Sequence, residues 1–280
     1  MQKRVAAIHD ISCFGKCSLT VALPILSAAG IETSVIPTAV LSTHTGGFTG
    51  YTYRDLAEDI LPIARHWQSL NLHFDALYSG FLGSFEQIAI VKDVFGRLRS
   101  DGTLVVVDPV MADNGELYKV FPADFPLGMR TLCENADVIV PNMTEAALLL
   151  DKPYREGPYD EAYIRRVLQS LAALGPRYVV LTGVYCDEAR LGAATLDQKT
   201  GEVSMLFAPR IAGYYHGTGD VFASTLLAGL LRGLPIAGAA QLAVDFTQGS
   251  IARTREAGTD IRFGVNFEEG IPALLDRLGL

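Results

Sequence analysis

The sequence is poor in charged residues, and it lacks an apolar run long enough to cross a membrane. Charged side chains make up 19% of the 280 residues, and the formal net charge is −8. This acidic balance argues against nucleic acid or an anionic membrane surface as the main partner, because both repel a negative protein. The longest apolar run, residues 221–231, predicts a buried helix instead of a membrane span. No signal peptide precedes the first apolar run, which predicts a cytoplasmic protein.

Cysteine is also scarce, and the four that are present form no disulfide or metal-binding pattern. Cys13 and Cys17 are four positions apart, but no second pair of ligands follows at the spacing of a zinc site. In a reducing compartment all of them would be free thiols. We therefore expect the cysteines to pack as structural residues.

Two widespread nucleotide-binding motifs are absent. The sequence has no G-x-x-x-x-G-K-[ST] loop, which excludes the P-loop class of phosphotransferases. It also has no G-x-G-x-x-G motif after its first apolar run, where residues 12–16 read Ser-Cys-Phe-Gly-Lys. This second absence counts against a dehydrogenase of the dinucleotide-binding type.

What the sequence does contain is a regular alternation of short apolar runs and amphipathic segments. The runs at 104–107, 138–140 and 178–181 are almost continuously apolar, as expected for parallel strands covered on both faces. We predict a doubly wound α/β fold, with a mostly parallel central sheet flanked by helices, in a single domain over residues 1–280. Further strands are expected at 5–9, 33–37 and 76–80, a hairpin at 191–196 and 203–207, and helices at 19–29, 55–71, 85–99, 144–150, 160–174 and from 220 onward.

The most informative motif is Gly217-Thr218-Gly219-Asp220, at the start of a predicted helix. Two glycines and a threonine let backbone N–H groups converge on an anion, and the helix dipole adds positive potential there. Asp220 would repel a simple anion, but it makes sense as the base that takes a proton from a hydroxyl attacking a phosphate. The alternative interpretation is that Asp220 is an ordinary acidic residue of a first helical turn.

Polar residues also follow several of the predicted strands. Because the carboxyl ends of parallel strands meet at one edge of a sheet, we expect these side chains to line one site. Taken singly, each has a structural alternative: Asp108 before a proline can form a turn, and Asn142 can cap a helix. The full set is His9, Asp10, Asp108, Asn142, Glu145, Thr182 and Gly183.

This set of residues suits phosphoryl transfer from a nucleotide. Such a reaction needs a divalent cation held by oxygen ligands, and Asp108 and Glu145 are the candidates for Mg²⁺. It needs donors that stabilise charge on the transferred group, which residues 217–219 can supply. It also needs a base beside the acceptor hydroxyl, for which Asp220 is the candidate.

Three motifs of the chain together resemble those of a known family. The motifs D-P-V-M at 108–111, P-N-x-x-E at 141–145 and G-T-G-D at 217–220 resemble the three signatures of the ribokinase-like superfamily. Within it, S-T-H-T at 42–45 and S-G-F-L-G-S at 79–84 resemble segments of the pyridoxal (pyridoxamine) kinases. The resemblance covers most of the chain, and the three core motifs together are highly specific for the superfamily.

The resemblance implies a role for each matching residue. Asp220 would deprotonate the acceptor hydroxymethyl group, with residues 217–219 as the anion hole. Asp108 and Glu145 would lie near the nucleotide phosphates and Mg²⁺. The implied nucleotide contacts are Asp108, Asn142, Glu145, Thr182 and Gly183, and the implied substrate contacts are Asp10, His44, Thr45, Gly46 and Phe81.

Three positions depart from the family pattern. Asp10 stands where many pyridoxal kinases carry Ser, and a carboxylate there can pair with a protonated ring nitrogen or with an amine. Phe81 stands where family members often have Tyr, which removes a hydroxyl but keeps the aromatic face. Thr182 stands where some members have Lys, and it supplies no charge. His44, in a Thr-rich loop, either contacts the substrate or bonds only within its surroundings.

The resemblance therefore implies phosphorylation, with ATP and Mg²⁺, of the 5′-hydroxymethyl group of pyridoxal, pyridoxine or pyridoxamine in vitamin B6 salvage. Three alternatives stay open: a hydroxymethylpyrimidine kinase of thiamine synthesis, a sugar or nucleoside kinase, and a non-catalytic B6-binding protein on the same scaffold. The preferred vitamer and the use of a monovalent cation stay open too. The family also implies a homodimer, and residues 111–121 are expected to form a loop that closes over the substrate.

Overall fold

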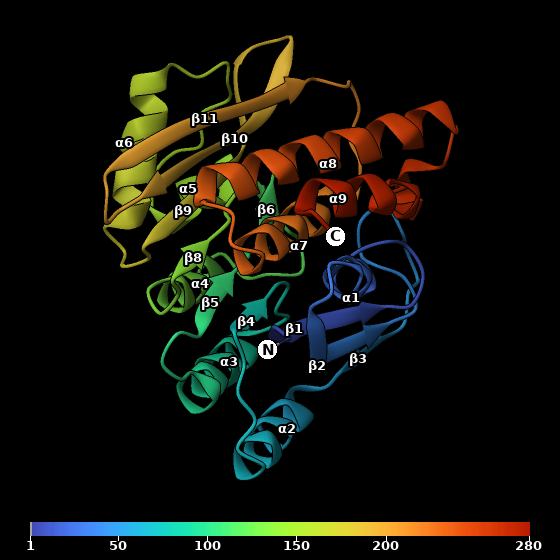
Figure 1. Cartoon of the computed structure of the whole chain (residues 1–280), viewed down its shortest axis with the longest axis vertical. Coiled ribbons are helices and arrows are strands. Elements are labelled where there is room, and N and C mark those ends of the chain that lie inside the picture. Colours follow the sequence, from blue (N-terminus) through green and yellow to red (C-terminus); the bar gives the residue numbers. More distant parts are fainter. Residues whose placement is uncertain (1) are drawn as a thin grey trace.

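Within residues 2–280, which the computed structural model describes, nine strands form one sheet with helices on both faces (Figure 1). The strands are β1 (Arg4–Ser12), β2 (Glu32–Leu41), β3 (Tyr53–Asp55), β4 (Ala76–Ser79), β5 (Leu104–Val107), β8 (Val138–Ile139), β9 (Tyr178–Asp187), β10 (Arg190–Asp197) and β11 (Glu202–Pro209). Their order is β11-β10-β9-β8-β5-β4-β1-β2-β3. The six strands from β9 to β2 pair in parallel, whereas β3, β10 and β11 add antiparallel edges. The predicted doubly wound, mostly parallel α/β fold is confirmed.

The helices divide into two layers. Counted along the chain, the second to sixth helices cover one face of the sheet. The first, seventh and eighth helices cover the other face (Figure 1). In chain order the helices are α1 (Leu19–Ala28), α2 (Ala57–Ser69), α3 (Phe85–Leu98), α4 (Phe125–Cys133), α5 (Met143–Leu149), α6 (Glu161–Ala172), α7 (Thr218–Leu231), α8 (Ile236–Glu256) and α9 (Ile271–Leu278).

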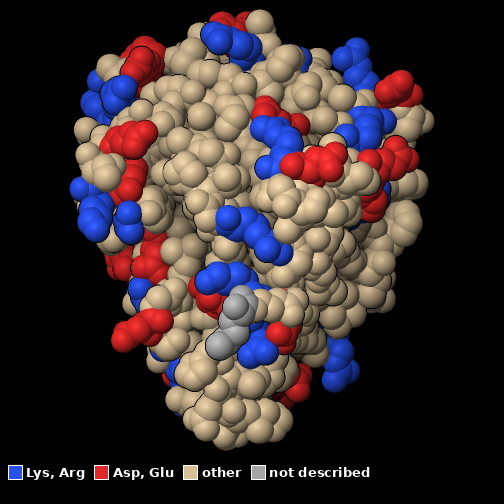
Figure 2. All heavy atoms as spheres, in the orientation of Figure 1, with Lys and Arg blue, Asp and Glu red and all other residues tan. Residues whose placement is uncertain are grey.

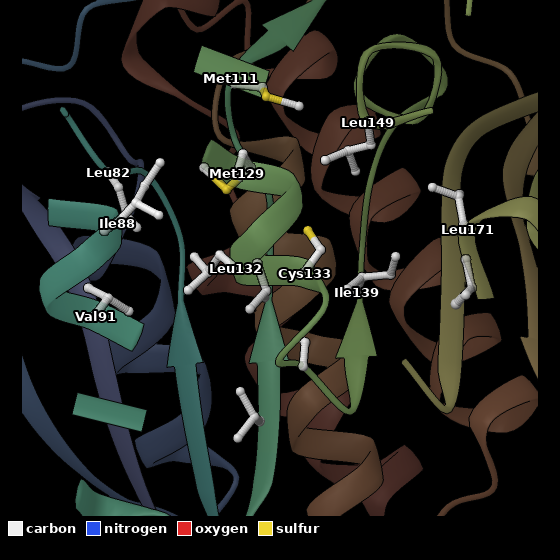
Figure 3. Close-up of a cluster of buried hydrophobic side chains, with 14 of the residues drawn as sticks. Leu82, Ile88, Val91, Met111, Met129, Leu132, Cys133, Ile139, Leu149 and Leu171 are labelled. Atoms are coloured by element: carbon white, nitrogen blue, oxygen red, sulfur yellow. The ribbon is translucent and has the colours of Figure 1, made fainter. Parts of the chain in front are cut away.

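The central strands are apolar throughout because each of their faces is buried under one helical layer. Val105 and Val107 of β5 pack into the cluster beneath α2–α6, while Val106 between them packs into the cluster beneath α1, α7 and α8. All three are fully buried. Figure 3 shows part of the first cluster, to which Leu132 and Cys133 of α4 and Ile139 of β8 contribute. This is the arrangement that a continuous apolar run predicts for a parallel strand.

Two predicted strands continue farther than their apolar runs indicated. The sequence suggested that β1 ends at His9 and β9 at Leu181, but β1 extends to Ser12 and β9 to Asp187. Each strand is extended because a neighbouring strand continues to pair with it. β2 pairs with β1 up to Ser12, and β10 pairs with β9 beyond Leu181. Asp10 and Thr182 therefore lie inside strands and do not follow them.

Helix α4 was not predicted, and its sequence explains why. It contains Pro126 in its first turn and Gly128 in its middle, and Leu127 points to solvent with 62% of its surface exposed. Proline is well tolerated at the start of a helix, where its missing N–H has no intrahelical partner. Gly128 lets the helix approach the ring of Phe85 on α3. These tertiary contacts outweigh a weak local helical pattern.

The segment 111–121, which was expected to be a mobile loop, contains a short hairpin. Its strands are β6 (Ala112–Asp113) and β7 (Glu116–Leu117), joined by Asn114 and Gly115 in left-handed conformations. An Asn-Gly pair is the usual sequence for such a turn. The backbone N–H of Gly115 donates to Thr144 Oγ1 of α5 at 3.0 Å, so the hairpin is anchored in this structure. Closure over a substrate stays a prediction.

The surface in Figure 2 carries mixed charge, with Lys and Arg next to Asp and Glu. Lys3 pairs with Asp75, Arg4 with Glu32 and Arg277 with Asp245. Neighbouring opposite charges cancel at a distance, so this face offers no broad basic area for a polyanion. In residues 2–280 we find no helix whose length and apolarity would let it span a membrane.

Candidate active site

The N-terminus of α7 lies against the segment between β1 and α1 at a glycine where any side chain would clash with the backbone. Gly217 precedes the helix in a left-handed conformation, with φ of +75°. A Cβ at this position would collide with the backbone carbonyl oxygen of Lys16. Close backbone approach and positive φ both favour glycine. The sequence signal at 217–220 therefore marks a true contact between two loops.

Beyond Gly217, the first turn of α7 presents unpaired backbone donors to open space. The first N–H groups of a helix have no intrahelical partners, and no hydrogen bond among the described residues uses those of Thr218 or Gly219. A Cβ built on Gly219 meets nothing within 4 Å, so no part of the chain fills the space above it. The Thr218 hydroxyl donates to the Tyr215 carbonyl oxygen at 3.2 Å and so braces the turn. This arrangement suits an anion.

Asp220 lies in the same first turn, and the pKa of its carboxyl group is close to neutral pH. Burial by surrounding protein raises its pKa to about 7, with a contribution from the negative charge of Asp10, while the backbone N–H of Ser18 opposes the shift. The residue is still partly exposed, so a substrate hydroxyl can reach it. A carboxylate with this pKa can accept a proton at physiological pH and return it readily.

Asp10 is the second acidic group near α7. It is 3% exposed, and it accepts a hydrogen bond from Ser12 Oγ at 3.1 Å through one carboxylate oxygen. Its other oxygen, Oδ1, has no partner among the described residues. Burial raises the pKa of this carboxyl group, while the hydroxyls of Ser18 and Ser12 oppose the shift. The charges of Asp220 and Asp10 also add to burial in raising the pKa of the Cys17 thiol, which shows that Cys17 lies near both carboxylates.

Asp108 and Glu145 come together, as predicted, but they differ in their bonding. Both Glu145 oxygens accept backbone N–H groups, from Asn142 at 2.8 Å and from Met111 at 3.1 Å. The Asp108 carboxylate makes no such hydrogen bond within the described chain, although its backbone N–H donates to Ser79 O at 2.9 Å. Burial raises the pKa of both carboxyl groups, and the Glu145 charge adds to the shift at Asp108.

This acidic pair fits a divalent cation only with help from other ligands. Two buried carboxyl groups with raised pKa values and no basic partner are the environment that a cation would stabilise. Within residues 2–280, however, no three His, Cys, Asp or Glu side chains are grouped to hold a metal ion by themselves. Mg²⁺ commonly keeps water and phosphate oxygens in its coordination shell. The oxygens of the Asp108 carboxylate are free, whereas both Glu145 oxygens already accept backbone N–H groups.

Asn142 has the structural role that the sequence left open as an alternative. It is the N-cap of α5, where its Oδ1 accepts from the N–H groups of Thr144 at 2.8 Å and Glu145 at 2.9 Å. Glu145 reciprocates by accepting the Asn142 N–H, which completes a capping box. The Asn142 amide also donates to Ala112 O at 2.8 Å. Its side chain is thus fully engaged in holding Glu145 and the β6–β7 hairpin, and a nucleotide contact by Asn142 stays a prediction.

Thr182 and Gly183 lie in β9, at the level where α5 begins. The Thr182 N–H donates to Pro141 O at 2.9 Å, and the Thr182 hydroxyl lies 3.5 Å from the same oxygen. Gly183 has a φ of +70° and open space beside its Cα. Both residues are therefore close to the capping box, and their contact with a nucleotide stays a prediction.

The loop after β2 is anchored by His44, which bonds within the chain through both ring nitrogens. Nε2 lies 2.6 Å from the carbonyl oxygen of Arg262, and Nδ1 accepts the backbone N–H of Gly46 at 3.1 Å. Burial lowers the pKa of His44, so the neutral ring that donates through Nε2 fits both contacts. The alternative that His44 bonds within its surroundings is observed. Thr45 lies between these anchored residues.

Phe81 follows β4 and packs on Phe121, with ring centroids 5.5 Å apart. It is only partly buried, and a contact of its ring with a substrate stays a prediction. Phe121 ends the segment 111–121 and stacks in turn on Phe125 of α4, with centroids 3.9 Å apart. Phe121, at the end of the segment 111–121 that was expected to close over the substrate, therefore packs directly on the Phe81 ring.

Sequence reasoning missed a group of aromatic residues around the loop after β2. His216 lies 5.1 Å from His44 and 4.9 Å from Tyr214, measured between ring centroids. Phe48 and Phe263 stack on each other at 6.4 Å. These residues come from segments that are far apart in the chain, so no spacing pattern could group them. The only available signal was the position of His216, directly before the glycine motif.

Comparison with known proteins agrees with this geometry. A family model described as phosphomethylpyrimidine kinase matches residues 25–264. The chain belongs to this family. A Bacteroides thetaiotaomicron protein provisionally named a phosphomethylpyrimidine kinase, crystallised with pyridoxal, is 36% identical; the match covers 100% of this chain and 96% of that one, with a TM-score of 0.93.

Two further relatives are named for vitamin B6. The structure of pyridoxal kinase from Lactobacillus plantarum is 34% identical, with a TM-score of 0.89, over 99% of this chain and 97% of that one. A pyridoxine/pyridoxal/pyridoxamine kinase from Bordetella avium is 28% identical over 268 residues, which are 90% of this chain and 86% of the relative. The resemblance to pyridoxal kinases of the ribokinase-like superfamily, predicted from the motifs, is confirmed.

Proposed function

We propose that this chain transfers the γ-phosphoryl group of ATP to the 5′-hydroxymethyl group of pyridoxal, pyridoxine or pyridoxamine. The single observation that carries the proposal is the first turn of α7, where open backbone donors and the Asp220 carboxyl group occupy the same place. The backbone donors can bind the phosphoryl group that is transferred, and the Asp220 carboxyl group can take the proton of the hydroxyl that attacks it. The B6 kinases among the relatives support the choice of substrate.

In this mechanism Asp220 accepts the proton of the substrate hydroxyl as the oxygen attacks the γ-phosphorus atom of ATP, whose bond to the bridging oxygen breaks so that ADP leaves. The N–H groups of Thr218 and Gly219, together with the positive end of the α7 dipole, stabilise negative charge on the transferred group. Asp108 would hold Mg²⁺, with the nearby Glu145 adding negative charge. A bound Mg²⁺ would neutralise charge on the phosphates. The capping box at Asn142 keeps Glu145 in position.

The remaining predicted contacts belong to two sides of the site. We assign Asp108, Asn142, Glu145, Thr182 and Gly183 to the nucleotide side, since β5, β9 and α5 bring them together. Asp10, His44, Thr45, Gly46 and Phe81 belong to the substrate side, where β1, the loop after β2 and the end of β4 meet. We also propose that the chain acts as one domain over residues 1–280, as a homodimer in the cytoplasm.

The pH dependence follows from the position of Asp220. A base must be ionised to act, so kcat/KM should be level above the pKa of about 7 and fall about tenfold per pH unit below it. The measurement is kcat/KM for pyridoxine across the neutral range, with coupling enzymes in excess. An acid limb centred near the ordinary pKa of an aspartate would contradict the assignment of Asp220.

The description of the family model favours a second candidate, phosphorylation of a hydroxymethylpyrimidine. ATP consumption should therefore be followed in parallel on pyridoxal, pyridoxine, pyridoxamine and hydroxymethylpyrimidine, with and without a chelator of Mg²⁺. We expect turnover on the B6 vitamers that stops with the chelator. Turnover on the pyrimidine alone would replace the proposed substrate, and tight pyridoxal binding without ATP consumption would indicate a binding protein.

A further inference from the structure

Two buried hydroxyl groups meet between the sheet and helix α7. Tyr78 belongs to β4 and Ser224 to α7, and both side chains are fully buried. Their hydroxyl oxygens lie 3.5 Å apart, and in residues 2–280 each hydroxyl is the only side-chain partner of the other. Buried polar groups normally have a hydrogen-bond partner, and here that partner is the second hydroxyl. The pair therefore links a central strand of the sheet directly to α7.

This link lies one helical turn along α7 from Asp220. Ser224 follows Asp220 by four positions, which places both residues on the same face of the helix. On the side of the sheet, burial raises the pKa of Tyr78, and the negative charges of Asp108 and Asp220 add to the shift. The Tyr78 hydroxyl is thus within electrostatic reach of the proposed base and of the proposed Mg²⁺ ligand.

The Tyr78 ring is held firmly in place. It belongs to the apolar cluster beneath α1, α7 and α8, and its strand β4 pairs on both sides, with β1 and β5. The His9 ring packs on it edge to face, with ring centroids 4.4 Å apart. Burial lowers the pKa of His9 to about 3, so this ring is neutral and brings no charge to the pair. The sheet consequently fixes the position of the Tyr78 hydroxyl.

Folding stability alone gives no reason for these two hydroxyls. Replacing both partners of a buried hydrogen bond with apolar groups of the same shape is close to neutral for folding. What a hydrogen bond adds is direction, because its strength depends steeply on distance and angle. The pair therefore fixes how α7 lies on the sheet more narrowly than apolar packing would.

We propose, building on the function proposed above, that Tyr78 is a positioning residue for phosphoryl transfer. Through Ser224 its hydroxyl holds the first turn of α7 against the sheet. This turn carries the Asp220 carboxyl group and the backbone donors, so the link sets where both stand relative to the reacting hydroxyl and phosphate. Reacting atoms must be held about 3–3.5 Å apart, and a small displacement of the groups that act on them slows the reaction.

The effect of the link should fall on kcat and leave KM almost unchanged. Tyr78 and Ser224 are fully buried, so neither side chain forms part of the surface that a substrate contacts. Hydrogen bonds of catalytic groups often shorten as the reacting complex forms. An interaction that strengthens in the transition state changes kcat, whereas one that is equal in the ground state changes KM.

The test compares variants of the pair with the wild-type protein in ATP consumption on pyridoxine. Tyr78→Phe removes one oxygen atom, and we expect kcat to fall about 3- to 10-fold, the factor that corresponds to one hydrogen bond. KM for pyridoxine should change by less than about 2-fold. Ser224→Ala should give the same result.

Thr225→Val is the matched control. Thr225 is the next residue of α7 and is equally buried, but its hydroxyl has no hydrogen-bond partner among the described residues. This variant also removes one buried hydroxyl from the helix without breaking a link to the sheet. It should therefore keep the kcat of the wild-type protein.

The double variant Tyr78→Phe/Ser224→Ala separates positioning from stability. Each single variant leaves one buried hydroxyl without its partner, which should lower the melting temperature. The double variant leaves none, so its melting temperature should return towards that of the wild-type protein. Its kcat should stay as low as in the single variants, since the same link is broken in all three.

Three results would overturn the proposal. A wild-type kcat in Tyr78→Phe would mean that the link does not act on the reaction. A kcat that recovers with the melting temperature in the double variant would make the pair purely structural. Losses in kcat that multiply in the double variant would mean that the two residues act independently. Failure of the proposed function looks different, because the wild-type protein itself would then turn over no B6 vitamer.

Discussion

Replacing Asp220 with asparagine is expected to lower kcat by about 10² to 10⁴, the usual contribution of a positioned general base. Asparagine keeps the shape and polarity of the side chain but cannot accept the proton of the substrate hydroxyl. KM for pyridoxine should change little, because the residue acts on the reacting hydroxyl and not on the ring. Steady-state kinetics of ATP consumption measure both constants. A kcat near that of the wild-type protein would remove Asp220 from the base role.

The stability of Asp220→Asn separates a catalytic defect from a folding defect. In the folded protein burial raises the Asp220 pKa to about 7, so the folded state holds this proton more tightly than the unfolded chain. The stability that the carboxyl group contributes is therefore fully present at acidic pH and is lost as the pH rises through about 7. Asparagine never ionises and avoids this loss. Above neutral pH the variant should melt at or above the wild-type temperature, while remaining almost inactive.

The parts of the site that could be predicted from the sequence are those with a local cause. A glycine before a helix, and an acidic residue directly after the apolar run of β5, follow from backbone geometry within a few residues. The capping box is equally local, since Asn142 and Glu145 are three positions apart. For this reason the structural alternative for Asn142 was visible in advance, and it proved to be the observed one.

What could not be predicted depends on contacts between distant segments. His44 is anchored by the carbonyl oxygen of Arg262, which lies 218 positions away in the chain. Asp10 was expected beyond the end of its strand, but β2 extends the ladder and holds it inside β1. The chain's local sequence contains no information on how far a neighbouring strand reaches. The lack of a partner for Asp10 Oδ1 likewise appears only when every surrounding element is in place.

Two glycines in one motif, Gly217 and Gly219, should respond to alanine in opposite ways. Gly217→Ala introduces a methyl group against the Lys16 carbonyl oxygen, which is backbone and cannot rotate away. It also forces alanine into a left-handed conformation, at about 1–2 kcal/mol. Overpacking of this kind adds about 1–3 kcal/mol. We expect the free energy of unfolding, measured by urea denaturation, to fall by roughly 2–5 kcal/mol in total.

Gly219→Ala is the matched control, since its methyl group meets nothing of the chain within 4 Å and its position is helical. Alanine in a helix is more stable than glycine by about 0.5–1 kcal/mol, so this variant should unfold at slightly higher urea concentration. Its kcat/KM should nevertheless fall by about 10-fold or more, because the methyl group enters the space where the transferred phosphate must approach the α7 amides. A stabilised protein with unchanged kcat/KM would mean that the phosphate lies elsewhere. A stabilised protein with reduced activity would mean that the ligand occupies the open space above Gly219. The folded chain itself has no contact that requires glycine at this position.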